Sequence, residues 1–390
     1  MEEVVLIRYG EIGLKGQNRP EFENALVRHL RHVVRGVQGA EVSKSHGRVY
    51  ITGAGFSRDL LGRLSRVPGV VAVNPAIRTE RDLGAIREAV VAAAREAANA
   101  RGPGATFKIE SRRSDKTFPL TSPELNKVLG DVVLAACPAL TVDVHNPSFV
   151  LTVEVRSEGA YMYWDEVPGP GGLPLGTQGR GLLLISGGID SPVAGYMAMK
   201  RGISVCALHF WSYPITSERS KDKVVRLARV LREYDPDLRL FVAPFTAIQT
   251  AIMEKCPENY RVTIMRRMMM RVASLLAERL DARAILTGEN VGQVASQTLE
   301  SLAAIEDAAS LPVLRPLICF NKVETIAIAR EIGTYELSVL PYEDCCSVFV
   351  PRHPVIRPKL ADARNAENAL DVEGLVRECA DKTEEVPLAR

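Results

Sequence analysis

The sequence predicts a multidomain α/β protein, in which two small α+β units precede a doubly wound parallel sheet. The chain has 390 residues, of which 46% are apolar, so it is long enough for two or three domains with hydrophobic cores. Strand and helix patterns alternate through residues 1–167. After a stretch rich in Gly and Pro, apolar strands alternate with amphipathic helices, which is the pattern of a parallel sheet.

The first unit, residues 1–75, opens with the strand pattern "VVLIRYGEI", which a basic, glycine-rich loop follows. A helix is expected next, because its apolar residues recur three and four positions apart. The strand "GRVYITG", the helix "RDLLGRLSRV" and the strand "GVVAVNPAIRTE" complete this unit. The apolar positions of the first helix are Phe22, Ala25, Leu26, Leu30 and Val33.

The second unit, residues 76–167, is again α+β. It begins with the alanine-rich helix "DLGAIREAVVAAAREAANA", and another helix is expected over residues 122–136. Strands are expected within "ATFKIESRRSDKTFP", "LTVDVHN", "FVLTVEVRSEG" and "AYMYWDEVPG". Residues 168–181, "PGPGGLPLGTQGRG", have no periodicity and are predicted to be a linker or a loop that leads into the next domain.

The third domain is expected over residues 182–390. Its strands are "GLLLIS", "SVCALHF", "LRLFVAPF" and "ARAILTGEN". Its helices are "SPVAGYMAMKRG", "KDKVVRLARVLREY" and a segment near 258–280. This alternation predicts the doubly wound sheet.

Charge and cysteine content exclude several classes of protein. The formal net charge is +2, so a surface that binds a polyanion must arise from local clusters of Lys and Arg. No apolar run reaches the roughly 20 residues of a membrane span, and the start Met1-Glu2-Glu3 lacks the character of a signal peptide, so we expect a cytoplasmic protein without membrane partners. Seven scattered cysteines without a CxxC pair favour neither a disulfide scaffold nor a structural zinc site.

The segment Ser186-Gly187-Gly188-Ile189-Asp190-Ser191 falls where the first strand of the third domain ends. Ligands of parallel sheets bind beyond the carboxyl ends of the strands, and the glycines allow a tight turn ahead of the positive end of a helix. This is the pattern of an anion-binding loop. It is not a Walker A loop, since no GxxxxGK[ST] occurs. The pattern resembles the PP-loop of the ATP pyrophosphatases, whereas the simplest alternative is an ordinary strand-to-helix turn.

Segments along nearly the whole chain resemble the tRNA 4-thiouridine synthetase (tRNA sulfurtransferase) family, in a short form without a rhodanese domain. They are "IRYGEIGLKGQNRPEFENAL", "FKIESRRSDKTFPLTSPELNKVLG", "GPGGLPLGTQGRGLLLISGGIDSPVAGYMA", "NYRVTIMRRMMMRVASLLA", "AILTGENVGQVASQTLESL", "VLRPLICFNKVETIAIAREIGT" and "LPYEDCCSVFVPRHP". The resemblance implies an N-terminal ferredoxin-like domain, a THUMP domain that binds RNA and a PP-loop catalytic domain. It also implies the activity, which is replacement of the 4-oxygen of the position-8 uridine in tRNA by sulfur.

This chemistry requires ATP, because adenylation turns the poorly reactive C4 oxygen of uridine into a good leaving group. The resemblance implies that the PP-loop holds the pyrophosphate, and Asp190 is the candidate for positioning Mg²⁺ or the activated oxygen. A helix cap is the alternative role of Asp190. Met268, Met269 and Met270 are most simply helix core, and His209 suits packing better than a role as a base. The implied ATP contacts are Leu184, Ile185, Ser186, Gly187, Gly188, Asp190, Ser191, His209, Phe210, Arg266, Gly288 and Gln297.

Delivery of sulfur needs a thiol that can carry a persulfide, and "EDCCS" holds the paired cysteines of the chain. Cys345 is favoured over Cys346, with two small buried residues as the alternative. The short form needs a separate sulfur donor, such as a cysteine desulfurase. Some relatives carry a CxxC associated with an iron–sulfur cluster where Thr263 and Arg266 stand here, so we predict no cluster. Cys206 and Cys256 are weak candidates for the thiol that resolves the disulfide.

Basic side chains gather in two loops of the first two units, where solvated loops are the alternative. Such residues bind phosphates and position an RNA without reading its bases. The resemblance implies that the THUMP unit grips the acceptor end of tRNA by shape, that the enzyme is a homodimer, and that sulfur is also supplied for thiamine biosynthesis. The candidate tRNA contacts are Lys15, Arg19, Lys108, Arg112, Arg113 and Lys116.

Two other functions fit parts of the sequence. A PP-loop ligase or amidotransferase for a small molecule would need no basic N-terminal units and would be expected to carry an ammonia route, which the sequence does not show. A non-catalytic RNA-binding module is disfavoured by the intact loop at residues 186–191.

Overall fold

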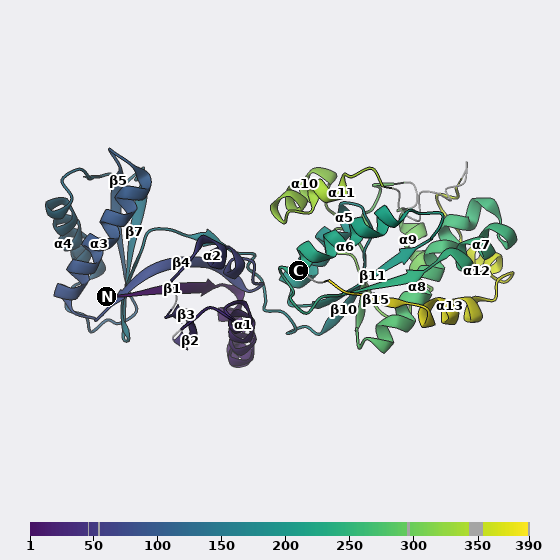
Figure 1. Cartoon of the computed structure of the whole chain (residues 1–390), viewed down its shortest axis with the longest axis horizontal. Coiled ribbons are helices and arrows are strands. Elements are labelled where there is room, and N and C mark those ends of the chain that lie inside the picture. The colour runs from purple at the N-terminus through teal and green to yellow at the C-terminus, as the bar shows by residue number, and fades with distance from the viewer. Residues whose placement is uncertain (46, 54, 295–296, 343–353, 389–390) are drawn as a thin grey trace. The chain divides into compact units, whose positions relative to one another are not determined.

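The computed structural model describes residues 1–45, 47–53, 55–294, 297–342 and 354–388. The chain divides into two compact units, Met1–Pro174 and Leu175–Arg390 (Figure 1). The division falls inside the stretch predicted to be a linker, 168–181.

In the described part of the first unit, the strands form one nine-stranded sheet in the order β2-β3-β1-β4-β8-β7-β5-β6, with β9 paired to β4 (Figure 1). The pairs β5–β7 and β5–β6 are parallel and the other pairs are antiparallel. The strands are β1 (Glu2–Tyr9), β2 (Glu41–Ser45), β3 (Arg48–Thr52), β4 (Val70–Thr79), β5 (Thr106–Arg113), β6 (Thr141–Val142), β7 (Phe149–Arg156), β8 (Gly159–Tyr163) and β9 (Val167–Pro168).

Strand β4 joins the two α+β halves of this unit. It pairs with β1 along its whole length, and its last residues, Ile77–Thr79, pair with β8. Helices α1 (Arg19–Val33) and α2 (Arg58–Leu64) cover one core, and helices α3 (Leu83–Arg101) and α4 (Ser122–Ala136) cover a second core. The predicted boundary between residues 75 and 76 therefore falls inside a continuous strand.

The first half of the predicted linker is part of the first unit. The amides of Gly169 and Gly171 donate to the carbonyls of Val71 and Val70 at 2.9 and 2.7 Å, and Leu173 is buried in the first core. These contacts extend the sheet past β9, because they continue the pairing of β9 with β4.

In the second unit, the described strands form a six-stranded sheet in the order β14-β13-β10-β11-β12-β15. All pairs are parallel except β12–β15, which is antiparallel. The chain runs from β10 to β11 on one side and returns to β13 on the other, so the strand order reverses beside β10. The strands are β10 (Arg180–Leu184), β11 (Ser204–Trp211), β12 (Arg239–Pro244), β13 (Ala284–Leu286), β14 (Val313–Leu314) and β15 (Glu384–Val386).

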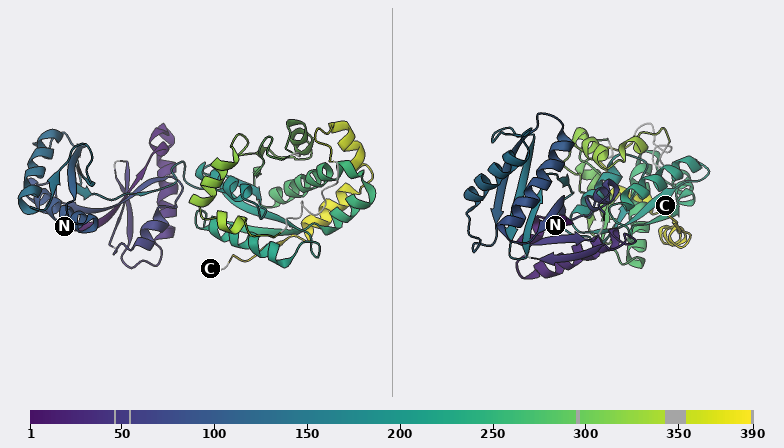
Figure 2. Two further views of the ribbon diagram at one scale, coloured as in Figure 1. Left: turned by 90° about the horizontal axis from the view of Figure 1, so that it is seen from above. Right: turned by 60° about the vertical axis from the view of Figure 1, so that its left-hand side comes forward.

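Helices cover both faces of this sheet, because successive strand residues face opposite sides (Figure 2). Leu183 packs against α5 (Asp190–Lys200), α6 (Glu218–Arg232) and their neighbours, whereas Leu182 packs against the layer of α8 (Arg261–Arg279). The first layer also holds α10 (Lys322–Glu331) and α11 (Tyr335–Ser338). The second also holds α7 (Thr246–Lys255), α9 (Leu299–Glu306), α12 (Leu360–Glu367) and α13 (Val372–Asp381).

The predicted fold class is confirmed: two α+β halves precede a doubly wound sheet. Strands β2 and β15 were not expected from the sequence. The helix expected near 258–280 is the 3-10 turn Glu258–Tyr260 followed by α8. None of the helices in the described ranges combines the length and the apolar character that a membrane crossing requires.

Candidate active site

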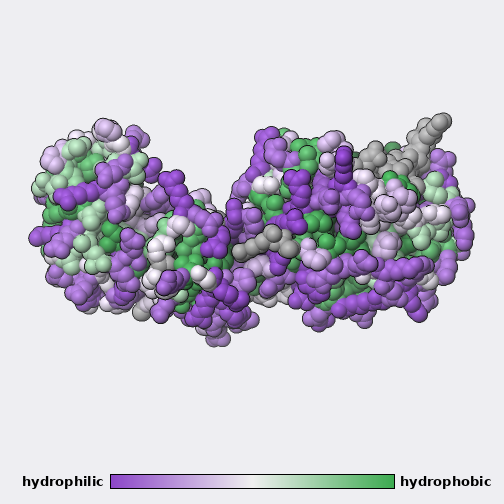
Figure 3. Space-filling model, viewed as in Figure 1, coloured by the Kyte–Doolittle hydropathy of each residue, from purple (hydrophilic) through white to green (hydrophobic). Residues whose placement is uncertain are grey.

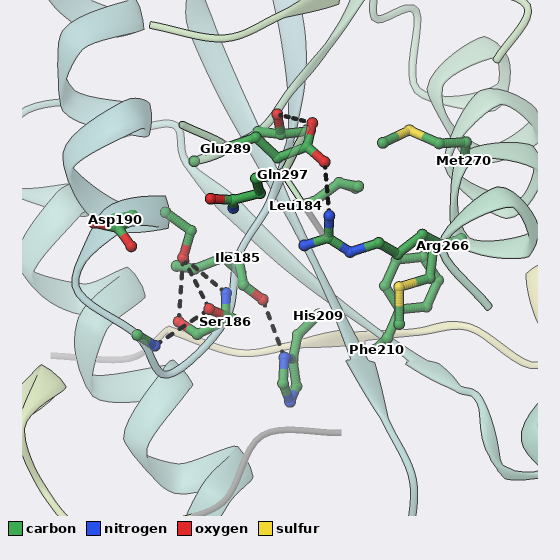
Figure 4. A pocket seen from close by; sticks show the side chains of 15 residues that line it. Leu184, Ile185, Ser186, Asp190, His209, Phe210, Arg266, Met270, Glu289 and Gln297 are labelled. Atoms are coloured by element: carbon green, nitrogen blue, oxygen red, sulfur yellow. Dashed lines mark hydrogen bonds and ion pairs between the residues drawn. The ribbon is translucent and has the colours of Figure 1, made fainter. Parts of the chain in front are cut away.

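A pocket of about 290 Å³ opens at the carboxyl ends of β10, β11 and β13, where the strand order reverses (Figure 4). Its volume is at the lower end of the range of small-molecule sites. It brings together every predicted ATP contact except Gly187, which lies in the same loop. The lining residues are Leu184, Ile185, Ser186, Gly188, Asp190, Ser191, His209, Phe210, Arg266, Met269, Met270, Thr287, Gly288, Glu289 and Gln297.

The loop after β10 is held in shape by its own hydroxyl groups. The Ser186 amide donates to Ser191 Oγ at 2.9 Å, and the Gly188 amide donates to Ser186 Oγ at 3.2 Å (Figure 4). Ser338 Oγ donates to the Gly188 carbonyl at 3.3 Å, which ties α11 to the loop. The two serines therefore fix the turn at the start of α5, before any ligand is considered.

Gly288 is required by packing. A Cβ at this position would lie 2.7 Å from the Ser191 nitrogen and 2.8 Å from the Asp190 carbonyl carbon. Both are backbone atoms at the start of α5, so a larger residue would push the end of β13 away from the loop. The structure thus gives a reason for this glycine that the sequence analysis did not consider.

Asp190 is the first residue of α5, and its carboxylate does not cap that helix. Lys322 Nζ lies 2.8 and 3.0 Å from its two oxygens, and Gln293 Nε2 donates to Oδ2 at 2.8 Å. Lys322 begins α10, whose N-cap Asn321 accepts from the Glu324 amide at 3.0 Å. The capped start of α10 therefore fixes the backbone position of Lys322. The sequence analysis did not identify Lys322.

A buried carboxylate faces the loop across the pocket. Glu289 is 6% exposed and accepts from Arg266 Nη1 at 3.1 Å, Arg315 Nε at 2.9 Å and Thr287 Oγ1 at 3.1 Å (Figure 4). Arg315 also donates to Glu306 at 2.6 Å, so two carboxylates balance the two guanidinium groups, and Glu289 holds Arg266 in place on the pocket lining. Arg266 reaches the pocket from α8 as predicted, and Glu289 and Arg315 were missed.

His209 and Phe210 form the floor of the pocket at the end of β11. His209 is 4% exposed, and its Nδ1 lies 3.1 Å from the Ile185 carbonyl, so it pairs two neighbouring strands. Phe210 packs edge-on against Phe245. Met269 and Met270 belong to the core as predicted, but they also line the pocket, which the sequence analysis did not foresee.

Cys345 and Cys346 lie outside the described residues. Cys206 and Cys256, the weak candidates for a resolving thiol, are both buried. Burial raises the pKa of each thiol, which disfavours the nucleophilic thiolate. Thr263 is buried within α8. The described residues contain no group of three or more His, Cys, Asp and Glu side chains arranged to hold a metal ion.

The predicted RNA contacts near the start of the chain are partly engaged within the protein. Lys15 Nζ lies 4.9 Å from the centre of the Phe22 ring. Arg19 donates to Glu23 at 2.7 Å and to the Tyr9 hydroxyl at 3.1 Å. Glu23 thus neutralises Arg19 locally, and Lys15 is the more available cation.

On β5, Lys108 and Arg112 occupy alternate positions with Glu110, opposite the buried face of the strand. Arg112 pairs with Glu110 at 2.8 Å. Arg113 donates to the Phe118 carbonyl at 2.9 Å and so shapes the following loop, on which Lys116 is exposed. Arg112 and Arg113 thus both have partners within the protein, whereas Lys116 is exposed on the loop.

Family comparisons match the three parts of the chain in order. The ThiI ferredoxin-like domain matches residues 4–74, the THUMP domain matches residues 80–165, and the thiamine biosynthesis protein (ThiI) matches residues 176–372. Together with the loop at the switch point, these matches place the chain in the PP-loop class of enzymes.

Similar proteins agree with this assignment. A probable tRNA sulfurtransferase of Moorella thermoacetica is 52% identical over 97% of this chain and 96% of the relative, and one of Brevibacillus brevis is 48% identical over 98% and 95%. A solved 4-thiouridine synthetase–RNA complex with bound ATP is 39% identical, with a TM-score of 0.89 over 99% of this chain and 100% of that chain. The chain belongs to the tRNA sulfurtransferase family.

Proposed function

We propose that this enzyme uses ATP to adenylate the 4-oxygen of the position-8 uridine in tRNA and then replaces that oxygen by sulfur from a persulfide. The observation that carries the proposal is the pocket at residues 184–191, where a serine–glycine loop faces Arg266 across a cavity of small-molecule size. The similar 4-thiouridine synthetase with bound ATP and RNA supports both substrates.

The pocket residues fit a nucleotide. The loop amides and the start of α5 suit the β and γ phosphates, while Arg266 suits the α phosphate. Leu184, Phe210 and Met269 offer apolar surface for the adenine ring. Asp190 would hold Mg²⁺, because magnesium in nucleotide sites is commonly bound by one or two carboxylates and the substrate phosphates. Bound Mg²⁺ would neutralise phosphate charge.

In the first step, the uridine O4 attacks the α phosphorus, the bond to the bridging oxygen breaks, and pyrophosphate leaves. The cations Lys322 and Arg266 stabilise the charge that moves onto the pyrophosphate and the α phosphate. The position of Arg266 on the pocket lining, where Glu289 holds it at 3.1 Å, supports this role.

In the second step, the terminal sulfur of a persulfide on Cys345 attacks C4 and AMP leaves. A second thiol, for which Cys346 is the nearest in sequence, then attacks the inner sulfur, so that 4-thiouridine is released and a disulfide forms. An external thiol must reduce this disulfide. A cysteine desulfurase or another persulfide donor recharges the enzyme, and the same sulfur serves thiamine thiazole synthesis.

Binding of the tRNA acceptor end by the first unit sets how far from that unit the target uridine lies. We propose that Lys15, Lys108, Arg112 and Lys116 contact phosphates near the acceptor end, together with Arg19 and Arg113 if their internal partners are exchanged. A homodimer, with one tRNA spanning both subunits, accords with this division of roles.

One assay tests the function. The enzyme is incubated with ATP, Mg²⁺, sulfide or a persulfide donor, a thiol reductant and unmodified tRNA, and 4-thiouridine is followed by its near-ultraviolet absorbance. We expect AMP, pyrophosphate and 4-thiouridine in equal amounts, only when tRNA is present. Formation of AMP and pyrophosphate with a small-molecule acceptor alone would instead identify a ligase.

A further inference from the structure

A second concave surface lies on the outer side of α6, away from the pocket lining. It encloses about 320 Å³ and is lined by one face of this helix together with Tyr342. We call it the α6 groove, and its residues are Arg219, Asp222, Lys223, Val225, Arg226, Arg229 and Tyr342.

The charge of the α6 groove is strongly positive. Arg219, Arg226 and Arg229 are exposed and follow one helix face, and among the residues that the structure describes none of the three has a carboxylate partner. Among the lining residues that the structure describes, Asp222 is the one acid, set against four basic side chains. Most other exposed arginines of this unit pair with an acid, as Arg239 does with Glu385 and Arg279 with Asp381.

The groove is connected to the PP-loop by a short stretch of chain. Ser338 binds the Gly188 carbonyl of the loop, and two residues later the Leu340 carbonyl accepts from Lys223 Nζ of α6 at 2.8 Å. Tyr342 follows and lines the groove. Helix α6 lies beside α5 and α11 (Figure 1). An elongated ligand in the groove would thus pass close to the loop that binds the nucleotide.

We infer that the α6 groove binds the phosphate backbone of the RNA substrate near the target uridine. Guanidinium groups match phosphate oxygens in pairs, and a tyrosine ring beside them suits a sugar or an unstacked base. Continuity with the PP-loop favours the substrate over an acidic protein partner, because the modified base must enter that pocket. This inference rests on the proposed function, and it adds an RNA contact on the catalytic domain to those of the first unit.

The test compares the full-length enzyme with a variant carrying Arg219→Ala, Arg226→Ala and Arg229→Ala. Binding of an unmodified tRNA transcript is measured over a range of salt concentrations. We expect affinity to fall by about tenfold or more near physiological salt, and the slope of log affinity against log salt to decrease by about one for each arginine removed. Single alanine variants should each lower the slope by about one.

A matched control removes three positive charges elsewhere in the same unit, through Lys255→Ala, Arg377→Ala and Lys382→Ala. These side chains are exposed on the opposite helix layer. Their loss should leave the salt slope nearly unchanged. ATP affinity, measured by calorimetry, should be equal in all proteins, which verifies that the pocket is folded. A triple arginine-to-lysine variant should keep the slope and lose part of the affinity.

Unchanged tRNA affinity and salt slope in the alanine variant would overturn the inference. If thiolation then fell with a protein persulfide donor but not with inorganic sulfide, the groove would be a docking site for the donor. Failure of the wild-type enzyme to thiolate tRNA would instead refute the proposed function, and the binding measurements would still decide whether the groove holds RNA.

Discussion

The contact between Asp190 and Lys322 joins the PP-loop to a helix that begins 132 residues later. Before ATP binds, the ammonium group of Lys322 neutralises the Asp190 carboxylate, which lines the pocket. When ATP and Mg²⁺ bind, Lys322 can pair with a phosphate and Asp190 with the metal ion, so each charge keeps an opposite charge beside it. This arrangement predicts that the two side chains act in activation of the uridine and not in RNA binding.

Asp190→Ala should abolish thiolation while leaving tRNA affinity unchanged, and Lys322→Ala should lower the rate of AMP formation by about a hundredfold or more. Thiolation and filter binding are measured on the same preparations. Glu254→Ala, an exposed change on α7, is the control. Loss of tRNA binding in either pocket variant would refute this division of roles.

Cys345→Ser should separate the two chemical steps. The variant keeps the pocket, so with tRNA present it should still release pyrophosphate and form adenylated tRNA, but it should make no 4-thiouridine. Cys379→Ser is a suitable control, because burial raises the pKa of that thiol to about 12 and removes it from sulfur chemistry. An enzyme that no longer consumes ATP after Cys345→Ser would show that this cysteine acts earlier than proposed.

Asp235 links stability to pH. It is 2% exposed and accepts the amides of Val205 and Asp237 at 3.0 and 3.1 Å. Burial raises its pKa to about 6, although both amides oppose this. Between about pH 4 and 6 the folded state therefore holds a proton that the unfolded state has lost, and stability decreases as pH rises through this window. The total decrease is about 3 kcal/mol at 1.36 kcal/mol per pKa unit.

Asp235→Asn should remove that decrease, because an amide does not titrate. Free energies of unfolding in urea at pH 4 and pH 7 should differ less for the variant than for the wild type by about 2.4 kcal/mol, because at pH 4 the unfolded state is still partly protonated. The variant also loses one hydrogen bond at both pH values. Asp237→Asn is the control, and equal pH dependence in the wild type and Asp235→Asn would contradict the assignment.

Some residues of the pocket could be predicted from the sequence, and others could not. Residues 186–191 could be predicted because they follow a strand of a parallel sheet, whereas Leu184, Ile185, His209 and Phe210 were implied by the family resemblance. Lys322 and Gln293 could not, since no periodicity relates them to Asp190. Gly288 could be predicted from the family resemblance, but its reason, the backbone of α5 within 3 Å, appears only in the folded chain.

Helix α8 is anchored by a buried ion network. Arg267 is 1% exposed, although an arginine is rarely so deeply buried. Its guanidinium binds Glu367 of α12 at 2.7 Å, Asp307 at 3.1 Å and the Ala304 carbonyl of α9. Arg271 binds the same glutamate at 2.8 Å. The network joins α8, α9 and α12, and it lies one residue from Arg266 of the pocket.

Glu367→Ala should destabilise the second unit by about 3 kcal/mol, because it removes one of the two carboxylates that bind the buried Arg267 and the carboxylate that binds Arg271. Burial alone would raise the pKa of Glu367, but hydrogen bonds from Arg271 and Arg267 outweigh burial. The pKa is therefore below its usual value, and the carboxylate is charged at neutral pH. Its contribution is present above the unfolded pKa and is lost in acid. Urea unfolding measures this, with the exposed Glu373→Ala as the control, for which less than about 1 kcal/mol is expected.

Some elements could not be predicted from sequence patterns, because they depend on contacts with distant parts of the chain. Strand β2, "EVSKS", has one buried residue, and its partner β3 supplies the sheet that makes it a strand. Strand β4 was predicted as one element, yet no pattern showed that it serves both α+β halves. Strongly periodic helices such as α4, with its Thr121–Glu124 capping box, were predicted within a residue.

Each of the two units has its own hydrophobic cores. Residues such as Leu26 and Phe107 belong to cores of the first unit, and Leu182 and Leu183 belong to cores of the second. Hydrophilic side chains cover most of the face of each unit that is in view (Figure 3). Separate cores predict separate unfolding.

Calorimetry should therefore show two transitions, and ATP with Mg²⁺ should raise only the one that belongs to the second unit. At a ligand concentration a hundred times the dissociation constant, the stabilisation is about 2.7 kcal/mol. Glu367→Ala should lower the same transition and leave the other in place. A single transition that moves as a whole with ATP would show that the two units unfold together.

Strand β15 is synthesised late, and until it forms, an edge of the sheet is open to aggregation. It covers the edge of β12, yet the ribosome makes it roughly 140 residues later. During that interval the nascent chain presents the apolar strand "RLFVAP" with one open edge, which is a template for pairing with other chains. Ribosome-associated chaperones would therefore protect this edge until late in translation. The protection is no longer needed once residues 384–386 pair with β12.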